Sequence, residues 1–479
     1  MVTPPAPEQQ SGVKESGIRL MSRLALEYNA VNLSQGFPNE APPPEGVVSI
    51  VCALLGGSAD KAQEIAKMPA QDLLQQMVER RSEADKNCSS SVSFEDFIRQ
   101  IITEKNAKDA HSQYSMPVGR PQIRKCIEEY YARWYGGNKG FLNGVTNQKN
   151  VDAEANITVT LGATEAFAVA LRSVCQPGDS ILVMEPYHEL YPQQAKVFHL
   201  NCEITTLFED EAANAWQLSF DDIRQKMRRC RALVLCDPHN PTGKVFTIPE
   251  LQQLCRICLD NDAYLITDDI YEHMIYDGAV RSKHVLPGFD TAQVLTKEAG
   301  FSDEDVVKMG SLSLLMNSVS KSFSCTGWRV GWLICPPHLA KTVRAVHDQL
   351  VLQAPTPMQL GVESLLDKMD EEYYRYLKNK YEERRDFLVT TLKQLNFEII
   401  GPFAAYYIFA KFRKVEKLKH FETAQDACMF LLKNCGVATV AGDTFYSNKE
   451  KANEYIRFCF CRQMDDLAEA ADRLKKNLQ

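Results

Sequence analysis

Between Asn156 and Cys335 the chain alternates short apolar runs with longer amphipathic stretches. Short runs without interspersed polar residues are typical of strands that are buried on both faces. We predict strands over Ile157–Leu161, Ile181–Met184, Ala232–Cys236 and Tyr264–Thr267, and helices over Ala166–Val174 and Ile248–Asn261. This alternation predicts an α/β fold in which helices cover both faces of a mostly parallel sheet. Ligands on such sheets bind beyond the carboxyl ends of the strands.

The length of 479 residues exceeds one ordinary core and predicts two domains. Residues 46–345 are expected to form the large domain, with a charged, helical insertion at about 53–110. Residues 1–45 and 346–479 are expected to form a smaller α+β domain. Its predicted elements are a helix over Glu371–Leu395 and strands over Phe397–Ile400, Tyr406–Phe412 and Tyr455–Cys461. The insertion is interpreted as a surface cover, and an interaction role for it stays open.

The composition narrows the class of protein. A net charge of −8 argues against nucleic acid or an anionic membrane as the main partner. Fifteen cysteines scattered through apolar runs suit reduced thiols, and the start of the chain lacks the basic and apolar regions of a secretory signal. The sequence therefore predicts a cytoplasmic protein. Cys255 and Cys258 have the spacing of a redox motif, but on a predicted helix they are interpreted as buried thiols.

A lysine among hydroxyl side chains is the first candidate for chemistry. Lys321 lies within Ser318–Ser324, and Arg329 follows eight residues later. A lysine amine can form a Schiff base with an aldehyde cofactor, and Ser318 and Arg329 can bind that cofactor's phosphate. Because serine-flanked lysines are common, this stretch does not identify a site by itself.

A run of small residues, Gly162-Ala163-Thr164, ends one predicted strand and opens the next helix. Small residues let backbone N–H groups approach an anion, and the helix N-terminus adds partial positive charge. The same residues also fit a plain turn in which Thr164 caps the helix. If the fold brings Ser318 and Arg329 beside this turn, the three together would form a phosphate site.

Two further strands end in polar groups. Asn240 lies in the turn Asp237–Gly243. It either only stabilises this turn, as asparagine commonly does, or donates from its amide to a cofactor or substrate oxygen. Asp268 ends the next strand, and Tyr271 follows three residues later. An aspartate there can cap a helix, but a buried carboxylate can also keep a heterocyclic nitrogen protonated, which makes the ring an electron sink.

A lone arginine, Arg457, lies in the apolar stretch Tyr455–Phe460. A buried charge is costly unless it is paired. The arginine therefore either forms a structural ion pair or binds a substrate carboxylate through its planar guanidinium.

Taken in chain order, these residues resemble the class I/II aminotransferases of fold type I. The resemblance rests on Gly162-Ala163-Thr164, Asn240-Pro241-Thr242-Gly243, Asp268, Tyr271, Ser318, Lys321, Arg329 and Arg457, and it runs from about Ile18 to the C-terminus. The stretch Val31–Pro38 looks most like the kynurenine and glutamine transaminase branch, which includes cysteine-S-conjugate β-lyases.

The resemblance implies a pyridoxal 5′-phosphate cofactor. Lys321 would bind the cofactor and then move the substrate proton, with Asp268 on the pyridine nitrogen and Tyr271 and Asn240 on the phenolate oxygen. The phosphate would be held by Ala163, Thr164, Ser318, Arg329 and Tyr114 of the partner subunit. Substrate carboxylate binding is implied for Gly36, Asn240 and Arg457. The family usually has an aromatic side chain stacked on the ring where this chain has His188, with Tyr187 as an alternative.

The resemblance thus predicts a homodimeric transaminase with no metal. It would move the amino group of an L-amino acid of the kynurenine, glutamine, methionine or aromatic type to a 2-oxo acid. Positions that carry aromatic side chains in the kynurenine branch are Ile18 and Thr164 here, which argues against a strictly aromatic substrate. A β-lyase acting on cysteine conjugates and a catalytically silent scaffold on the same fold are the alternatives.

Overall fold

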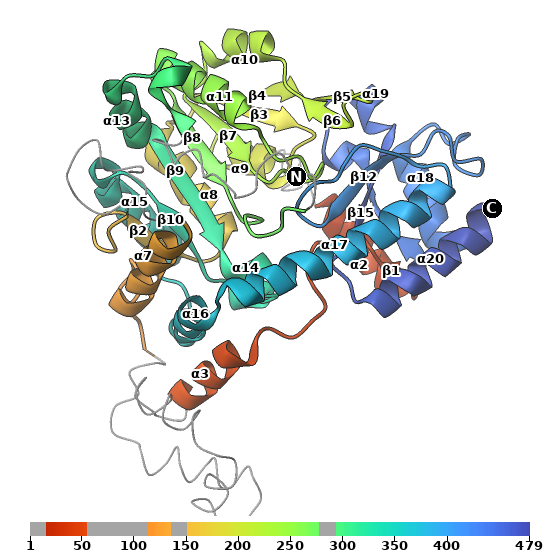
Figure 1. Ribbon diagram of the computed structural model, residues 1–479, viewed down its shortest axis with the longest axis horizontal. Helices are drawn as coiled ribbons and strands as arrows, with labels where there is room; N and C mark the ends of the chain where they lie inside the picture. The colour runs from red at the N-terminus through yellow and green to blue at the C-terminus, as the bar shows by residue number, and fades with distance from the viewer. Residues whose placement is uncertain (1–15, 55–112, 136–150, 277–293) are drawn as a thin grey trace, which may run out of the picture.

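A computed structural model describes residues 16–54, 113–135, 151–276 and 294–479 (Figure 1). Most of the predicted insertion at 53–110 therefore lies outside the described residues. The largest sheet has seven strands in the order β2-β10-β9-β8-β7-β3-β4. The strands are β2 (Ile157–Thr160), β3 (Ser180–Glu185), β4 (Asn201–Thr206), β7 (Ala232–Cys236), β8 (Tyr264–Asp268), β9 (Ser313–Ser318) and β10 (Gly331–Ile334). All pairings are parallel except those of β10, which is antiparallel to both of its neighbours.

Alternate residues of the central strands face two separate apolar layers. Ile181 and Val183 of β3 pack with helices α8 (Ala163–Val174) and α15 (Pro337–Val351). Leu182 and Met184 face the opposite layer. That layer contains α10 (Phe220–Met227), α11 (Ile248–Asp260) and α13 (Asp303–Leu312). Burial on both faces explains why these strands read as continuous apolar runs, and the predicted α/β class is confirmed.

A second, antiparallel sheet has the order β11-β12-β15-β14. Its strands are β11 (Glu398–Ile399), β12 (Tyr407–Lys411), β14 (Val440–Ala441) and β15 (Tyr455–Cys459). Nearby, β1 (Val31–Asn32) pairs in parallel with β13 (Val437–Ala438), so the N-terminal segment is held beside the C-terminal part of the chain. The helices around this sheet are α2 (Gly17–Glu27), α17 (Glu371–Gln394), α18 (Ala424–Phe430) and α20 (Met464–Leu478) (Figure 1).

Helix α7 (Pro121–Tyr135) packs against the edge strand β2, and two further helices pack beyond it. α16 (Thr356–Lys368) packs against both α3 (Pro44–Leu54) and α7. The short helix α14 (Val319–Ser322) begins directly after β9. In the part of the chain that the structure describes, no helix combines the length and the apolar content that crossing a membrane requires. Among the cysteines whose side chains the structure places, all are free thiols and all except Cys202 are buried, as predicted for Cys255 and Cys258.

Candidate active site

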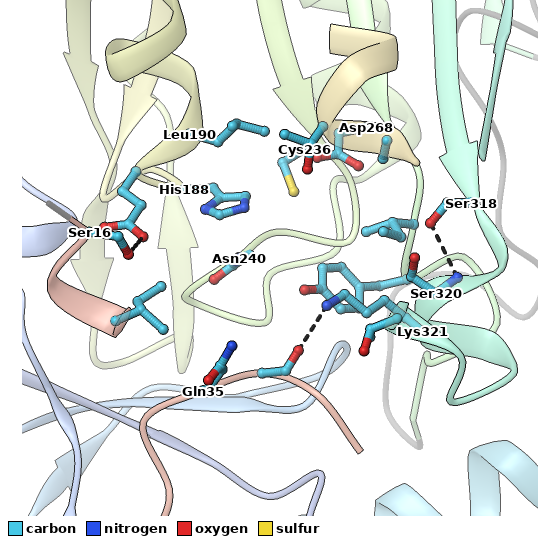
Figure 2. Close-up of a pocket in the computed structure, with 18 of the residues that line it drawn as sticks. Ser16, Gln35, His188, Leu190, Cys236, Asn240, Asp268, Ser318, Ser320 and Lys321 are labelled. Atoms are coloured by element: carbon cyan, nitrogen blue, oxygen red, sulfur yellow. Dashed lines mark hydrogen bonds between the residues drawn. The ribbon is translucent and has the colours of Figure 1, made fainter. Parts of the chain in front are cut away.

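A cavity of about 600 Å³ lies at the carboxyl ends of the parallel strands, facing the second sheet. Residues at or just beyond the ends of β3, β7, β8 and β9 line it, together with Tyr407 of β12 and Arg457 of β15 (Figure 2). The cavity contains the predicted residues Gly36, Ala163, Thr164, His188, Asn240, Asp268, Tyr271, Ser318, Lys321, Arg329 and Arg457. The fold thus brings together every predicted site residue except Tyr114.

Lys321 points into this cavity from α14. Its Nζ donates a hydrogen bond of 2.8 Å to the carbonyl of Gly36, which Figure 2 shows as a dashed line. Burial lowers the pKa of Lys321 to about 8, and the positive charges of Arg329 and Arg457 contribute to the lowering. A substantial fraction of this amine is therefore neutral near physiological pH, which is the form that acts as a nucleophile or base.

Asp268, at the end of β8, has one free carboxylate oxygen. Tyr191 donates to its Oδ2 at 2.7 Å, while Oδ1 is buried and has no hydrogen-bond partner. Burial raises the pKa of Asp268 to about 6, against the effect of the Tyr191 hydrogen bond, which lowers it. A buried acceptor without a donor is costly, so Oδ1 is well suited to a ligand that brings its own N–H group.

The N-terminus of α8 forms a cradle with an arginine. Arg329 extends its Nη2 to the carbonyl of Leu161 at 3.1 Å, beside Gly162. A Cβ atom on Gly162 would lie 2.8 Å from the Arg329 Cζ, and the φ of Gly162 is +76°. Only glycine tolerates both the close approach and this backbone conformation. Ser318 caps α14 on the other side, where its hydroxyl accepts from the backbone of Ser320 at 3.2 Å.

Arg457 is buried, with 1 % of its surface exposed, and no carboxylate neutralises it among the described residues. Its Nη1 donates to Asn240 Oδ1 at 3.2 Å and its Nη2 to the carbonyl of Ser34 at 2.7 Å, whereas Nε has no partner. The guanidinium also lies 4.2 Å from the ring centroid of Tyr407. The expected structural ion pair is therefore not found, and a buried positive charge faces the cavity.

Two tyrosines line the cavity from opposite sides, Tyr271 from beyond β8 and Tyr407 from β12 of the second sheet. Tyr271 and Tyr407 share a hydrogen bond of 3.0 Å between their hydroxyl groups. Tyr406 donates to the carbonyl of Gly36 at 3.0 Å, and a Cβ atom on Gly36 would lie 2.7 Å from the Tyr407 Cζ. Glycine at position 36 therefore lets this backbone lie directly against the tyrosines.

His188 lines the cavity, and the structure does not place it in an exposed loop. Its Nδ1 is buried without a partner, and burial lowers the pKa of His188 to about 3, so the ring is neutral. Tyr187 instead packs into the apolar layer behind α8 and does not line the cavity. The geometry thus favours His188 over Tyr187 as a planar side chain at this position.

Tyr114 lies apart from this cavity, with 81 % of its side chain exposed. Its exposure is compatible with a contact to another subunit and does not by itself identify one. In the described ranges no cluster of His, Cys, Asp or Glu has the arrangement of a metal site.

The family profile described as "Aminotransferase class I and II" matches residues 88–474. This chain is a class I and II aminotransferase. A protein named "Probable N-succinyldiaminopimelate aminotransferase DapC" from Mycobacterium tuberculosis is 27 % identical, covering 95 % of this chain and 94 % of that protein. Human "Kynurenine--oxoglutarate transaminase 1" is 25 % identical over 95 % of this chain and 94 % of its own length.

Solved structures agree with the fold. The structure of N-succinyldiaminopimelate aminotransferase from Mycobacterium tuberculosis matches with a TM-score of 0.76 and 26 % identity, covering 99 % of this chain and 100 % of that chain. The predicted fold type I architecture is confirmed, and the chain is a transaminase that depends on pyridoxal phosphate.

The residues of the cavity fit this cofactor. Asp268 Oδ1 is a buried acceptor without a donor, which a protonated pyridine nitrogen supplies. The Gly162 turn, the α8 N-terminus and Arg329 form a cradle of N–H donors that would suit the phosphate. Lys321 supplies an amine whose lowered pKa suits attack on an aldehyde.

Proposed function

We propose that this enzyme transfers the α-amino group of an L-amino acid to a 2-oxo acid, with donors of the kynurenine, glutamine, methionine or aromatic type. The observation that carries the proposal is the placement of Lys321, Asp268 and Arg457 around one cavity, with an amine, a carboxylate and a guanidinium directed into it. The relatives are named for kynurenine–oxoglutarate and N-succinyldiaminopimelate transamination, which supports a transaminase and leaves the substrate to be ranked by experiment.

The proposed roles follow from the contacts. Arg457, assisted by Asn240, binds the α-carboxylate through its planar guanidinium. When bound, pyridoxal phosphate supplies the electron sink that acidifies the substrate Cα–H bond. Lys321, as a neutral amine, would take the proton from the substrate Cα and return it on the cofactor side of the substrate nitrogen. Asp268 holds positive charge on the pyridine nitrogen, and its buried position keeps water away from that interaction.

The remaining residues are proposed to orient these groups. Ala163, Thr164, Ser318 and Arg329 bind the phosphate, Tyr271 bonds the phenolate oxygen, and His188 packs against the ring. Gly36 lies within reach of the substrate, because its carbonyl already accepts from Lys321. We further propose a homodimer, in which Tyr114 of the partner subunit completes the phosphate contacts.

The test is a half-reaction followed by absorbance. Enzyme loaded with cofactor receives one L-amino acid at a time and no acceptor. We expect the visible absorbance of the aldehyde form to convert to that of the amine form, and the conversion rates to rank the donors. Lys321→Ala should reduce the conversion rate by at least about 10²-fold, since a positioned general base typically contributes 10²–10⁴-fold. A cofactor-loaded enzyme that no amino acid converts would contradict the proposal.

The alternative chemistry is β-elimination from a cysteine S-conjugate, which needs the same loss of the Cα proton and differs in the leaving group at Cβ. Release of ammonia and pyruvate from such a conjugate without an added 2-oxo acid would identify it.

A further inference from the structure

A buried histidine joins α15 to the helix that begins at the cofactor cavity. α15 packs against α8 (Figure 1), and the side chain of His347 on α15 is fully buried. Its Nδ1 lies 3.0 Å from Oε1 of Glu165, a residue in the first turn of α8. Its Nε2 lies 2.8 Å from the carbonyl of Pro117. Both ring nitrogens therefore face oxygen atoms that accept hydrogen bonds.

These two contacts determine how many protons the pair of Glu165 and His347 holds. A neutral histidine donates from one ring nitrogen only, so beside a carboxylate it would leave one of the two contacts without a hydrogen. Both hydrogen bonds form when the pair holds one more proton, either as imidazolium and carboxylate or as imidazole and carboxylic acid. In both arrangements the pair carries no net charge.

Glu165 is directly connected to the cradle formed by the α8 N-terminus and Arg329. Its Oε2 accepts from the backbone N–H of Leu161 at 3.0 Å, and the carbonyl of Leu161 accepts from Arg329 Nη2 at 3.1 Å. Glu165 itself does not line the cavity, so its carboxyl group lies behind the cradle. An uncompensated negative charge at this place would oppose the attraction of the helix N-terminus for an anion.

We propose that His347 is a positioning residue for cofactor binding, which neutralises Glu165 and so keeps the N-terminus of α8 favourable for a phosphate. The inference rests on the proposed phosphate-binding role of this N-terminus and Arg329. It adds a residue that does not line the cavity and that acts on the phosphate through Glu165. Glu165 in turn holds the Leu161 peptide to which Arg329 is bound.

The experiment measures cofactor binding with and without the phosphate group. The full-length enzyme is dialysed to equilibrium against pyridoxal phosphate or against pyridoxal, which lacks the phosphate. In His347→Gln the new amide cannot supply a positive charge, so we expect the Kd for pyridoxal phosphate to rise roughly 3- to 30-fold, the effect of one charge near a helix terminus. The Kd for pyridoxal should not change. His338→Gln, the same substitution at an exposed position of α15, is the matched control and should alter neither Kd.

Removing the carboxylate separates charge from structure. In Glu165→Gln the amide can accept from Leu161 and donate to Nδ1 of a neutral His347, so each hydrogen bond is kept while the charge is lost. We expect this variant to bind pyridoxal phosphate at least as tightly as the wild-type enzyme. The double variant with Glu165→Gln and His347→Gln should regain the affinity that His347→Gln alone loses. If His347 only linked α15 to α8, the double variant would bind no better than His347→Gln.

Three results would overturn the inference: no recovery in the double variant, an equal loss for pyridoxal phosphate and pyridoxal in His347→Gln, or weaker binding of pyridoxal phosphate in Glu165→Gln. The last result does not depend on whether His347→Gln folds. Because binding is measured without turnover, each of these results leaves the transaminase proposal standing. That proposal fails separately, if the cofactor-loaded enzyme converts no amino acid in the half-reaction.

Discussion

Lys321 titrates in an unusual environment for a lysine. Burial and the charges of Arg329 and Arg457 lower its pKa to about 8, against an ordinary value of about 10.4. Only the neutral amine attacks an aldehyde, so the rate at which cofactor-free enzyme takes up pyridoxal phosphate should rise with pH through a midpoint near 8. Stopped-flow absorbance measures this midpoint, over a range from about two pH units below it to about three above it.

Removing a neighbouring positive charge provides the control for this midpoint. In Arg457→Gln the protonated lysine is less destabilised, so the midpoint should move to higher pH. A wild-type midpoint near 10 would show that Lys321 is well solvated, contrary to the burial on which the prediction rests.

Tyr191 lowers the pKa of Asp268 through a single hydrogen bond. Its hydroxyl donates to Oδ2 at 2.7 Å, which stabilises the carboxylate and lowers a pKa that burial raises to about 6. Tyr191→Phe removes this donor but keeps the ring that packs against Phe167. The pKa of Asp268 should therefore rise, and the acidic limb of kcat/KM should move to higher pH.

A pH profile of the Tyr191→Phe enzyme checks this prediction, with Tyr187→Phe as the matched variant. Tyr187 is buried in the same apolar layer but makes no contact with Asp268, so its loss should leave the acidic limb in place. If the acidic limb of the kcat/KM profile did not move in Tyr191→Phe, the titration of Asp268 would not be the cause of that limb.

The turn between β2 and α8 is the element that the phosphate contact depends on most. Gly162→Ala would put a Cβ atom 2.8 Å from the Arg329 Cζ and force a side chain onto a residue with φ +76°. We expect the dissociation constant for pyridoxal phosphate to rise about tenfold or more, because the guanidinium must move away from the helix N-terminus. Equilibrium dialysis with the cofactor measures the change.

Gly178→Ala separates the backbone cost from the contact with Arg329. Its φ is +94°, but no atom lies within 4 Å of the added Cβ. This variant should lose only about 1–2 kcal/mol of stability and bind the cofactor normally. If cofactor binding weakened equally in both variants, the effect of Gly162→Ala would come from general destabilisation and not from displacement of Arg329.

Four strands of the seven-stranded sheet, β2, β3, β7 and β8, could be predicted from their apolar runs, whereas β4, β9 and β10 could not. The range of β7 matches the prediction, β8 is one residue longer at its end, and β3 is one residue longer at each end. β4 was missed because it is an edge strand with polar, partly exposed residues, which leaves no apolar run. β10 was also missed, because it is short and begins with glycine. It pairs antiparallel to both of its neighbours, and the local sequence does not indicate this pairing.

The site residues that belong to sequence motifs could be predicted and line the cavity. The residues that hydrogen-bond to them could not be predicted from the sequence. Tyr191 lies 77 positions from Asp268 along the chain, and Tyr407 lies 136 positions from Tyr271. Each is one tyrosine among many in the sequence. The hydroxyl of Tyr191 reaches the site through the packing of α9 (Leu190–Val197) on the seven-stranded sheet, and that of Tyr407 through the packing of the second sheet against it.

At the scale of the whole molecule, the segment that carries Tyr114 is held in place from α16 and the loop before it. Gln353 accepts from the backbone and hydroxyl of Ser115, and Thr356 donates to the carbonyl of Gln113 at 3.0 Å. The segment is therefore fixed although the Tyr114 side chain is exposed. Met116, Leu350 and Leu352 are also exposed apolar side chains in these segments, which supports a subunit contact here.

Hybrid dimers test whether Tyr114 completes the site of the partner subunit. We expect Tyr114→Ala and Lys321→Ala homodimers each to lose activity, since the first weakens phosphate binding and the second lacks the reactive amine. When the two are unfolded and refolded together, a mixed dimer has one site with Lys321 of one subunit and Tyr114 of the other. That site should regain activity well above the sum of the two parents at limiting cofactor. If Tyr114 acted within its own subunit, no mixed site would have both residues, and activity would stay at that sum.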